Sequence, residues 1–187
     1  MLELVLAAVT ATADVLISAG HEGRPASCVH FPNHKCNLGT AGERALTPRV
    51  ADEVVRVLRA DGFSVIRKPA DFEGTFAVKD AVFIHFDGNT TRCGSGASIG
   101  YHREQDEAAA DAWRSLYTQH WKFRFQPDNF TDNLSDYYGF RQVDASDAAL
   151  VLELGELTCP QQSAWLQPRL HSLGQLIARF LESRLKR

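Results

Sequence analysis

Four short segments, far apart in the sequence, place a side chain that can bind a metal or move a proton where a buried strand should end. Two of them, residues 15–21 and 82–85, are apolar runs that lead into His21 and His85. Residues 150–155 carry Glu153 within leucine and valine, and Glu43 follows a glycine. Because parallel strands gather their carboxyl ends at one edge, where ligand sites of open α/β folds form, we expect these side chains to meet there.

The rest of the chain alternates strands with helices, which is typical of a mostly parallel sheet covered on both faces. Strands are expected at residues 15–18, 63–67, 81–86 and 149–154, with a further candidate at 96–101. Helices are expected from Thr47, as N-cap before Pro48, to Asp61, then at 104–121 and 168–186. We therefore predict a three-layer α/β fold with a twisted, mostly parallel sheet flanked by helices.

The length of 187 residues suits a single domain, expected at residues 14–187. Residues 1–13 are apolar and end in small residues, which is compatible with the remnant of a secretory signal or an N-terminal extension. They lack a positively charged start and carry Glu3, so a first strand or helix is the alternative.

The charge balance and the hydropathy of the chain limit the kinds of partner that it can bind. The net charge is only −3, from 20 basic and 23 acidic residues, so no nucleic acid is expected as a partner. No apolar run approaches the roughly 20 residues of a membrane-spanning helix. We expect a monomer that recognises its ligand by shape and local chemistry.

Four cysteines permit two disulfides in an oxidising compartment. Cys28 and Cys36 would close one loop, and Cys93 with Cys159 would join two loops at the rim of the sheet. Four free thiols in a reducing cytosol are the alternative. A structural zinc site formed by Cys28, Cys36 and the two histidines between them is a third possibility, although its spacing is tighter than in the usual zinc modules.

The strand-end residues have the composition of a metal centre. Two histidines and a carboxylate, here His21, His85 and Glu43, form a known catalytic zinc set that leaves the fourth position to water. Glu153 would then serve as general base. Taken singly, either histidine could pack in the core or in a loop, and the negative charge of Glu43 could stabilise the N-terminus of a helix. Glu153 is harder to explain structurally, because an unpartnered carboxylate is costly to bury. Together the four predict a hydrolase with one catalytic zinc ion.

The same segments resemble the zinc-dependent N-acetylmuramoyl-L-alanine amidases of the amidase_3 type, over roughly residues 14–185. Residues 18–23 read Ser-Ala-Gly-His-Glu-Gly, where the family has Asp-Ala-Gly-His-Gly-Gly. Glu43 precedes a helix that ends in Gly-Phe-Ser-Val, which is similar to the family's Gly-Tyr-x-Val. Phe-Ile-His-Phe-Asp at 83–87 and Leu-Glu-Leu-Gly-Glu at 152–156 resemble Ser-Ile-His-Ala-Asn and Val-Glu-Leu-Gly-Phe.

The resemblance implies a phosphorylase/hydrolase-like fold, His21, Glu43 and His85 as zinc ligands, and Glu153 as catalytic carboxylate. It implies hydrolysis of the amide between N-acetylmuramic acid and L-alanine, with peptidoglycan as the partner and a periplasmic or secreted location. A cytoplasmic location stays open. A zinc peptidase with another amide substrate and a metal-free cell-wall binding module are the alternative functions.

Departures from the family pattern mark candidate substrate contacts. Asp87 and Asn89 replace plainer residues after the second histidine, and Glu156 stands where an apolar residue is usual. Arg24 and Arg67 are candidates to meet a substrate carboxylate. Residues 101–140 offer one amphipathic helix and then an irregular aromatic stretch, whose side chains are candidates to line a groove, among them Phe130, Tyr137 and Tyr138. We therefore expect no extra helix over the site and an openly accessible cavity.

Overall fold

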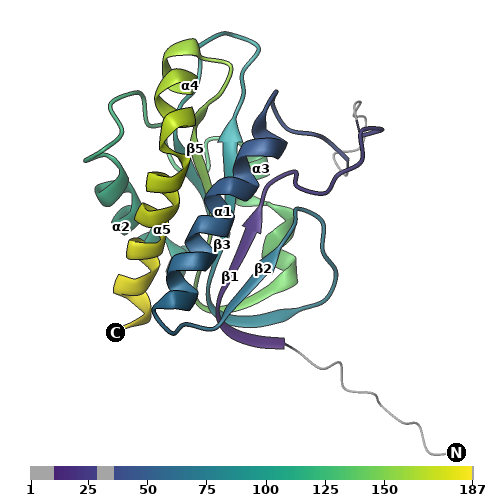
Figure 1. Cartoon of the computed structure of the whole chain (residues 1–187), viewed down its shortest axis with the longest axis vertical. Coiled ribbons are helices and arrows are strands. Elements are labelled where there is room, and N and C mark those ends of the chain that lie inside the picture. The colour runs from purple at the N-terminus through teal and green to yellow at the C-terminus, as the bar shows by residue number, and fades with distance from the viewer. Residues whose placement is uncertain (1–10, 29–35, 187) are drawn as a thin grey trace, which may run out of the picture.

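The computed structural model describes residues 11–28 and 36–186. Within them one five-stranded sheet is flanked by helices (Figure 1). The strands are β1 Ala11–Ala19, β2 Val65–Lys68, β3 Phe76–Asp87, β4 Ser98–Gly100 and β5 Val143–Glu156. Their order is β2-β1-β3-β5-β4; the first four run parallel and β4 lies antiparallel at the edge. This confirms the predicted α/β fold.

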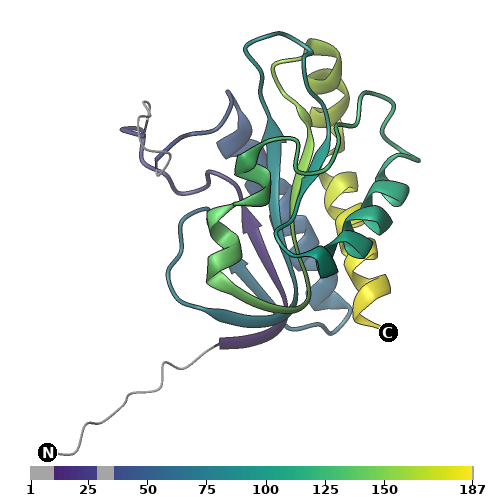
Figure 2. The same cartoon turned by 180° about the vertical axis from the view of Figure 1, so that it is seen from behind.

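Helices form a layer on each face of the sheet. They are α1 Glu43–Ala60, α2 Glu107–Tyr117, α3 Asp132–Ser135, α4 Pro160–Leu166 and α5 Leu170–Leu185, with 3₁₀ turns η1 Glu104–Asp106, η2 Tyr138–Gln142 and η3 Gln167–Arg169. The long helices α1, α2 and α5 cover one face (Figure 1), and the short α3 and η2 lie on the other (Figure 2).

Alternate residues of each strand pack against the helices on the two faces of the sheet, because successive side chains of a strand point to opposite faces. Ile17, Ile84 and Leu152 pack toward α1 and α5, whereas Leu16 and Phe83 pack toward the short helices. Both sets are almost fully buried. Burial on both faces explains why the central strands read as continuous apolar runs.

The first strand and the first helix both begin earlier than the sequence indicated. β1 starts at Ala11, and residues 11–13 pair with 76–78 of β3. Residues 1–10 lie outside the described part. Helix α1 starts at Glu43, after Gly42 in the left-handed conformation, so Pro48 lies inside the helix and Thr47 is not its N-cap. The Thr47 hydroxyl donates instead to the carbonyls of Gly20 and Glu43, which ties the helix to the end of β1.

The other helical predictions also need correction. In place of one helix over 104–121, a 3₁₀ turn precedes α2, which ends at Tyr117. The buried stripe runs through Ala109, Trp113 and Tyr117, while His120 lies beyond the helix and is exposed. The Tyr117 hydroxyl donates to the Leu154 carbonyl at 2.6 Å, and this hydrogen bond allows the hydroxyl to be buried. The terminal helix begins only at Leu170, and α4 was not expected.

The cysteines form the two predicted disulfides, Cys28–Cys36 and Cys93–Cys159. A structural zinc site at the first pair therefore loses its two thiolates; its histidines, at positions 30 and 34, lie outside the described residues. Among the helices of the described ranges, none has the length and apolar character needed to cross a bilayer.

Candidate metal centre

The candidate site lies where the strand order of the sheet reverses. β1 and β3 are neighbours, but the chain after β1 leads to β2 on one side of the sheet and the chain after β3 leads to β4 on the other, so the two connections leave a crevice between them. His21 follows β1, His85 lies near the end of β3, and Glu43 is the first residue of α1. Such a switch point is where open α/β sheets bind ligands.

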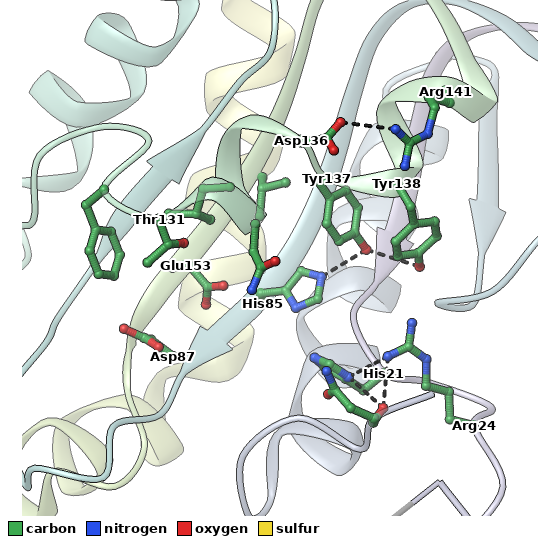
Figure 3. Close-up of a pocket in the computed structure, with 15 residues that line it drawn as sticks. His21, Arg24, His85, Asp87, Thr131, Asp136, Tyr137, Tyr138, Arg141 and Glu153 are labelled. Atoms are coloured by element: carbon green, nitrogen blue, oxygen red, sulfur yellow. Dashed lines mark hydrogen bonds and ion pairs between the residues drawn. The ribbon is translucent and has the colours of Figure 1, made fainter. Parts of the chain in front are cut away.

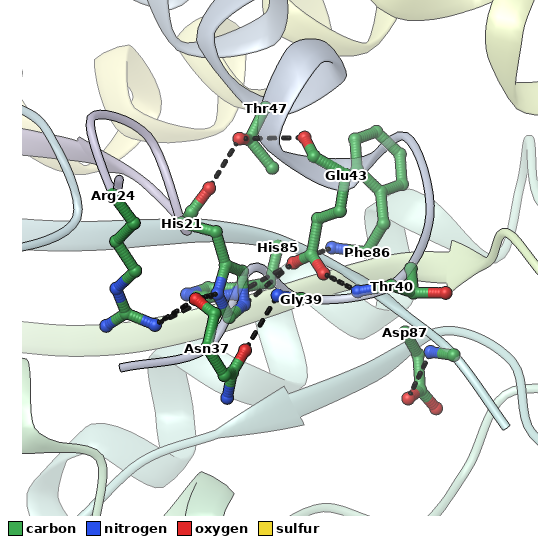
Figure 4. A network of polar contacts seen from close by, with 12 residues as sticks. His21, Arg24, Asn37, Gly39, Thr40, Glu43, Thr47, His85, Phe86 and Asp87 are labelled. Carbon is green, nitrogen blue, oxygen red and sulfur yellow. Dashed lines mark hydrogen bonds and ion pairs between the residues drawn. The ribbon is translucent and has the colours of Figure 1, made fainter. Parts of the chain in front are cut away.

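His21, Glu43 and His85 are brought together with their ligand atoms within 4.8 Å of one another. His85 Nδ1 lies 3.0 Å and His21 Nε2 3.4 Å from Glu43 Oε1 (Figure 4). The two imidazole planes stand at 88°, with centroids 5.0 Å apart. All three side chains are buried. Two imidazole nitrogens and a carboxylate oxygen match the donor set of a catalytic zinc site, so these residues fit the ion that the sequence predicts.

Glycines allow this close approach. A Cβ at Gly20 would lie 2.3 Å from the His85 ring, and one at Gly39 would lie 2.1 Å from Glu43 Oε2. His21 itself takes the left-handed conformation, with φ 60°, so its ring turns back over the end of β1. The backbone of both loops is therefore shaped around the three ligand side chains.

Backbone groups fix Glu43 and His21. The Thr40 N–H donates to Glu43 Oε2 at 3.0 Å, and the Phe86 N–H donates to Oε1 at 3.1 Å. Burial alone would raise the pKa of Glu43, but the two imidazoles and the Phe86 N–H bring it below its usual value, so the carboxylate stays ionised. His21 Nδ1 lies 2.9 Å from the Asn37 carbonyl, which orients Nε2 toward Glu43.

Burial also keeps His21 in the form that a metal requires. It lowers the pKa of His21 to about 4, against the opposing attraction of Glu43. The imidazole is therefore neutral at physiological pH, with a lone pair available for a cation.

Glu153 lies beside the histidine pair because His85 and Glu153 are register partners on β3 and β5. Its Oε2 is buried without a hydrogen-bond partner. Burial, reinforced by the carboxylates of Glu43 and Asp87, raises the pKa of Glu153 well above its usual value. A raised pKa makes the Glu153 carboxylate a stronger base, which suits a group that takes up a proton.

The site opens into a cavity of about 580 Å³ (Figure 3). Its lining includes His21, Arg24, Asn37, His85, Asp87, Phe130, Thr131, Asn133, Leu134, Asp136, Tyr137, Tyr138, Arg141, Val151 and Glu153. A second cavity, of about 480 Å³, shares His21, His85, Asp87 and Glu153 and extends toward Asn89. Phe130, at 38% exposure, is the large apolar side chain most open to solvent among the described residues.

The predicted substrate contacts divide into two groups. Arg24 and Asp87 line the main cavity, and Asn89 lines the second one. Arg24 is already paired, because its Nη2 lies 2.8 Å from Asp71 Oδ1. Asp87 keeps a buried Oδ2 without a partner, so it is the member of the group with a free acceptor.

Glu156 and Arg67 lie away from the cavities. Glu156 is fully buried and accepts hydrogen bonds from the N–H groups of Cys93 and Ser95 and from the Thr158 hydroxyl. The structure therefore places Glu156 within the loop framework and not at the substrate surface. Arg67, on β2, pairs with Glu22 of the loop after β1 and with Asp52 of α1.

Tyr137 and Tyr138, which the sequence offered as candidates to line a groove, do line the cavity. His85 Nε2 lies 3.1 Å from the Tyr137 hydroxyl, which lies 3.2 Å from that of Tyr138. His102, which follows β4, contacts the Ser135 carbonyl through Nδ1 and lines neither cavity. Helix α2 packs on the sheet face opposite His85 and so does not cover the site. The prediction of no extra helix needs correction, because the short α3 and the turn η2 lie on the His85 face and line the cavity.

Comparisons with known proteins identify the fold. No family model and no curated protein match the sequence. Among solved structures, N-acetylmuramoyl-L-alanine amidase AmiC2 of Nostoc punctiforme matches with a TM-score of 0.63 and 18% identity over 95% of this chain and 98% of that one. The catalytic domain of the amidase CwlV from Bacillus (Paenibacillus) polymyxa var. colistinus matches with a TM-score of 0.65 and 16% identity, over 95% of this chain and 99% of that one. The amidase Ami1 from Mycobacterium smegmatis matches with a TM-score of 0.64 and 18% identity, over 94% of this chain and 97% of that one. The chain therefore has the α/β fold of these N-acetylmuramoyl-L-alanine amidases.

Proposed function

We propose that this protein is a zinc-dependent amidase that hydrolyses the bond between N-acetylmuramic acid and L-alanine in peptidoglycan. The observation that carries the proposal is the meeting of two imidazoles and a carboxylate beside a second, unpartnered carboxylate, at the switch point of the sheet. The fold likeness to amidases over nearly the whole chain supports the same conclusion.

His21, Glu43 and His85 would hold the ion. Zinc, when bound, supplies Lewis acidity that polarises the scissile carbonyl and lowers the pKa of water. Glu153 takes a proton from the attacking water and delivers it to the departing amine of L-alanine. A raised pKa makes the Glu153 carboxylate a stronger base toward the attacking water, and the carboxyl group can then return the proton to the departing amine.

The cavity has the size and mixed chemistry of a ligand site, since such cavities usually span about 300–1,000 Å³. We assign Asp87 Oδ2 to an N–H of the substrate, because this oxygen is buried without a partner. Phe130 offers an apolar surface at the rim. Arg24 and Asn89 are further proposed contacts. The location of α2 on the opposite face supports activity without a separate activator.

Two disulfides support action in an oxidising compartment, such as the periplasm or the cell exterior. There the enzyme would meet peptidoglycan directly. We further propose that the folded part of the chain acts as one catalytic domain.

Release of soluble peptides from purified peptidoglycan tests the function. Glu153→Gln keeps the shape of the side chain but removes its proton chemistry, so we expect zinc binding to persist while activity falls about 10²- to 10⁴-fold. Glu107→Gln, at an exposed position of α2, is the matched control and should retain full activity. Mass analysis should identify released peptides that begin with L-alanine.

The other outcomes separate the alternatives. Zinc binding by a wild-type protein that leaves this bond intact would point to a peptidase acting on other amides. A wild-type protein that binds neither zinc nor another divalent ion would favour a cell-wall binding module.

A further inference from the structure

Two adjacent tyrosines link His85 to a backbone carbonyl on another loop. His85 Nε2 lies 3.1 Å from the Tyr137 hydroxyl oxygen, and Tyr137 donates to the Tyr138 oxygen at 3.2 Å (Figure 3). Tyr138 donates in turn to the carbonyl of Ala70, between β2 and β3. We refer to this series, from His85 to the Ala70 carbonyl, as the tyrosine relay.

The end of the relay sets the direction of every hydrogen bond in it. A carbonyl oxygen can only accept, so the single Tyr138 proton goes to Ala70. The Tyr138 oxygen then accepts the proton of Tyr137, whose own oxygen is left to accept. Both phenols keep their protons at neutral pH, because tyrosine titrates near pH 10. The remaining donor is therefore N–H at Nε2 of His85.

The same assignment leaves Nδ1 of His85 with a lone pair. Nδ1 faces Glu43 Oε1, at 3.0 Å, in the candidate metal site. With the proton on Nε2, this lone pair and the Glu43 carboxylate point at each other, and a cation bound between them makes the contact favourable. A neutral imidazole carries one proton, so a proton on Nε2 makes Nδ1 available to a cation. The opposite tautomer would need Tyr137 to donate to His85, and the oxygens of Tyr137 and Tyr138 would then face each other without a proton between them.

Packing holds the relay in place. The Tyr137 ring lies 5.0 Å from Phe83 and 5.3 Å from His85, measured between centroids. The chain passes so close to these rings that a Cβ at Gly139 would lie 2.5 Å from Phe83 and 2.7 Å from Tyr137. The Tyr137 hydroxyl therefore has little freedom to turn away from His85.

We propose that Tyr137 is a positioning residue that, through Tyr138 and the Ala70 carbonyl, holds the proton of His85 on Nε2 and so presents Nδ1 to the metal ion. This inference rests on the proposed zinc site and adds to it a source of metal affinity outside the three ligands. Groups that orient a metal-bound histidine typically contribute about 10- to 100-fold to metal affinity.

Zinc affinity of Tyr137→Phe, measured by competition with a chromophoric chelator, tests the proposal. The variant leaves the buried Nε2–H without its acceptor, so we expect zinc to bind about 10- to 100-fold more weakly. Tyr138→Phe should have a smaller effect, because Tyr137 can still accept from His85. Tyr117→Phe is the matched control: it removes a buried tyrosine hydroxyl, bonded to the Leu154 carbonyl on the far face, and should leave zinc affinity unchanged.

Long-range ¹H–¹⁵N spectra of the zinc-loaded wild type provide a second readout, which does not depend on how a variant folds. We expect His85 to carry its proton on Nε2 and to bind zinc through Nδ1. The reverse assignment would overturn the proposal, as would a Tyr137→Phe protein with wild-type affinity or an equal loss in Tyr117→Phe. Failure of the wild type to bind zinc would remove the proposed zinc site as well, whereas normal binding with an unaffected Tyr137→Phe would remove the relay alone.

Discussion

Gly20→Ala tests whether the end of β1 is shaped around the candidate metal site. The added Cβ would lie 2.3 Å from Cε1 and 2.4 Å from Nδ1 of His85, whereas ordinary contacts begin near 3.4 Å. The φ of Gly20 is not in the left-handed region, so alanine fits the backbone and the conflict is with the ring alone. The His85 ring must therefore move by about 1 Å.

Such a shift exceeds what a metal site tolerates. Ligand distances in zinc sites vary by only about 0.2 Å, and His85 is confined by the rings of His21 and Tyr137. The Gly20 N–H donates to the Ile84 carbonyl at 2.8 Å, so the backbone cannot easily retreat. We expect at least about a 100-fold loss of zinc affinity and about 1–3 kcal/mol of destabilisation from overpacking.

Chelator competition and urea unfolding of the metal-free protein measure the two effects separately. Gly62→Ala is the control, because Gly62 has φ +88° but open space around its Cβ position. It should lose about 1–2 kcal/mol through backbone strain and keep its zinc affinity. Zinc binding by Gly20→Ala within threefold of wild type would refute the geometric argument.

Two further predictions concern stability. Replacing both Cys93 and Cys159 with serine opens a disulfide between residues 66 positions apart and should cost about 4 kcal/mol, from the entropy of loop closure, in urea unfolding; a loss below about 1 kcal/mol would contradict this. The Lys79 ammonium, with the hydrogen bonds of Ser64, lowers the pKa of Asp14 from 3.8 to about 2. The carboxylate therefore stabilises the fold above about pH 4 and loses this effect as the pH falls through 2. Asp14→Asn should cost about 1 kcal/mol or less at pH 7 and almost nothing at pH 2, and an equal cost at both would refute the assignment.

The sequence alone determined the class of the fold and the neighbourhood of the site. Apolar runs that end in His21, His85 and Glu153 predicted parallel strands with polar carboxyl ends. A parallel sheet brings these ends to one edge regardless of the conformation of the loops. Helix ends were less well predicted. Thr47 and Pro48 carry a local start signal, but Gly42 and the bonds of Glu43 begin α1 a full turn earlier.

Tertiary structure alone decided how each side chain is used. Glu156 and Glu153 stand three positions apart on β5, yet the first is enclosed by loop N–H groups and the second is left without a partner. Tyr137 meets His85 across 52 positions of sequence. Local patterns report periodicity and polarity, because these depend on neighbours along the chain. Hydrogen-bond partners, tautomers and shifted pKa values depend on groups that only packing brings together, so they could be known only from the folded molecule.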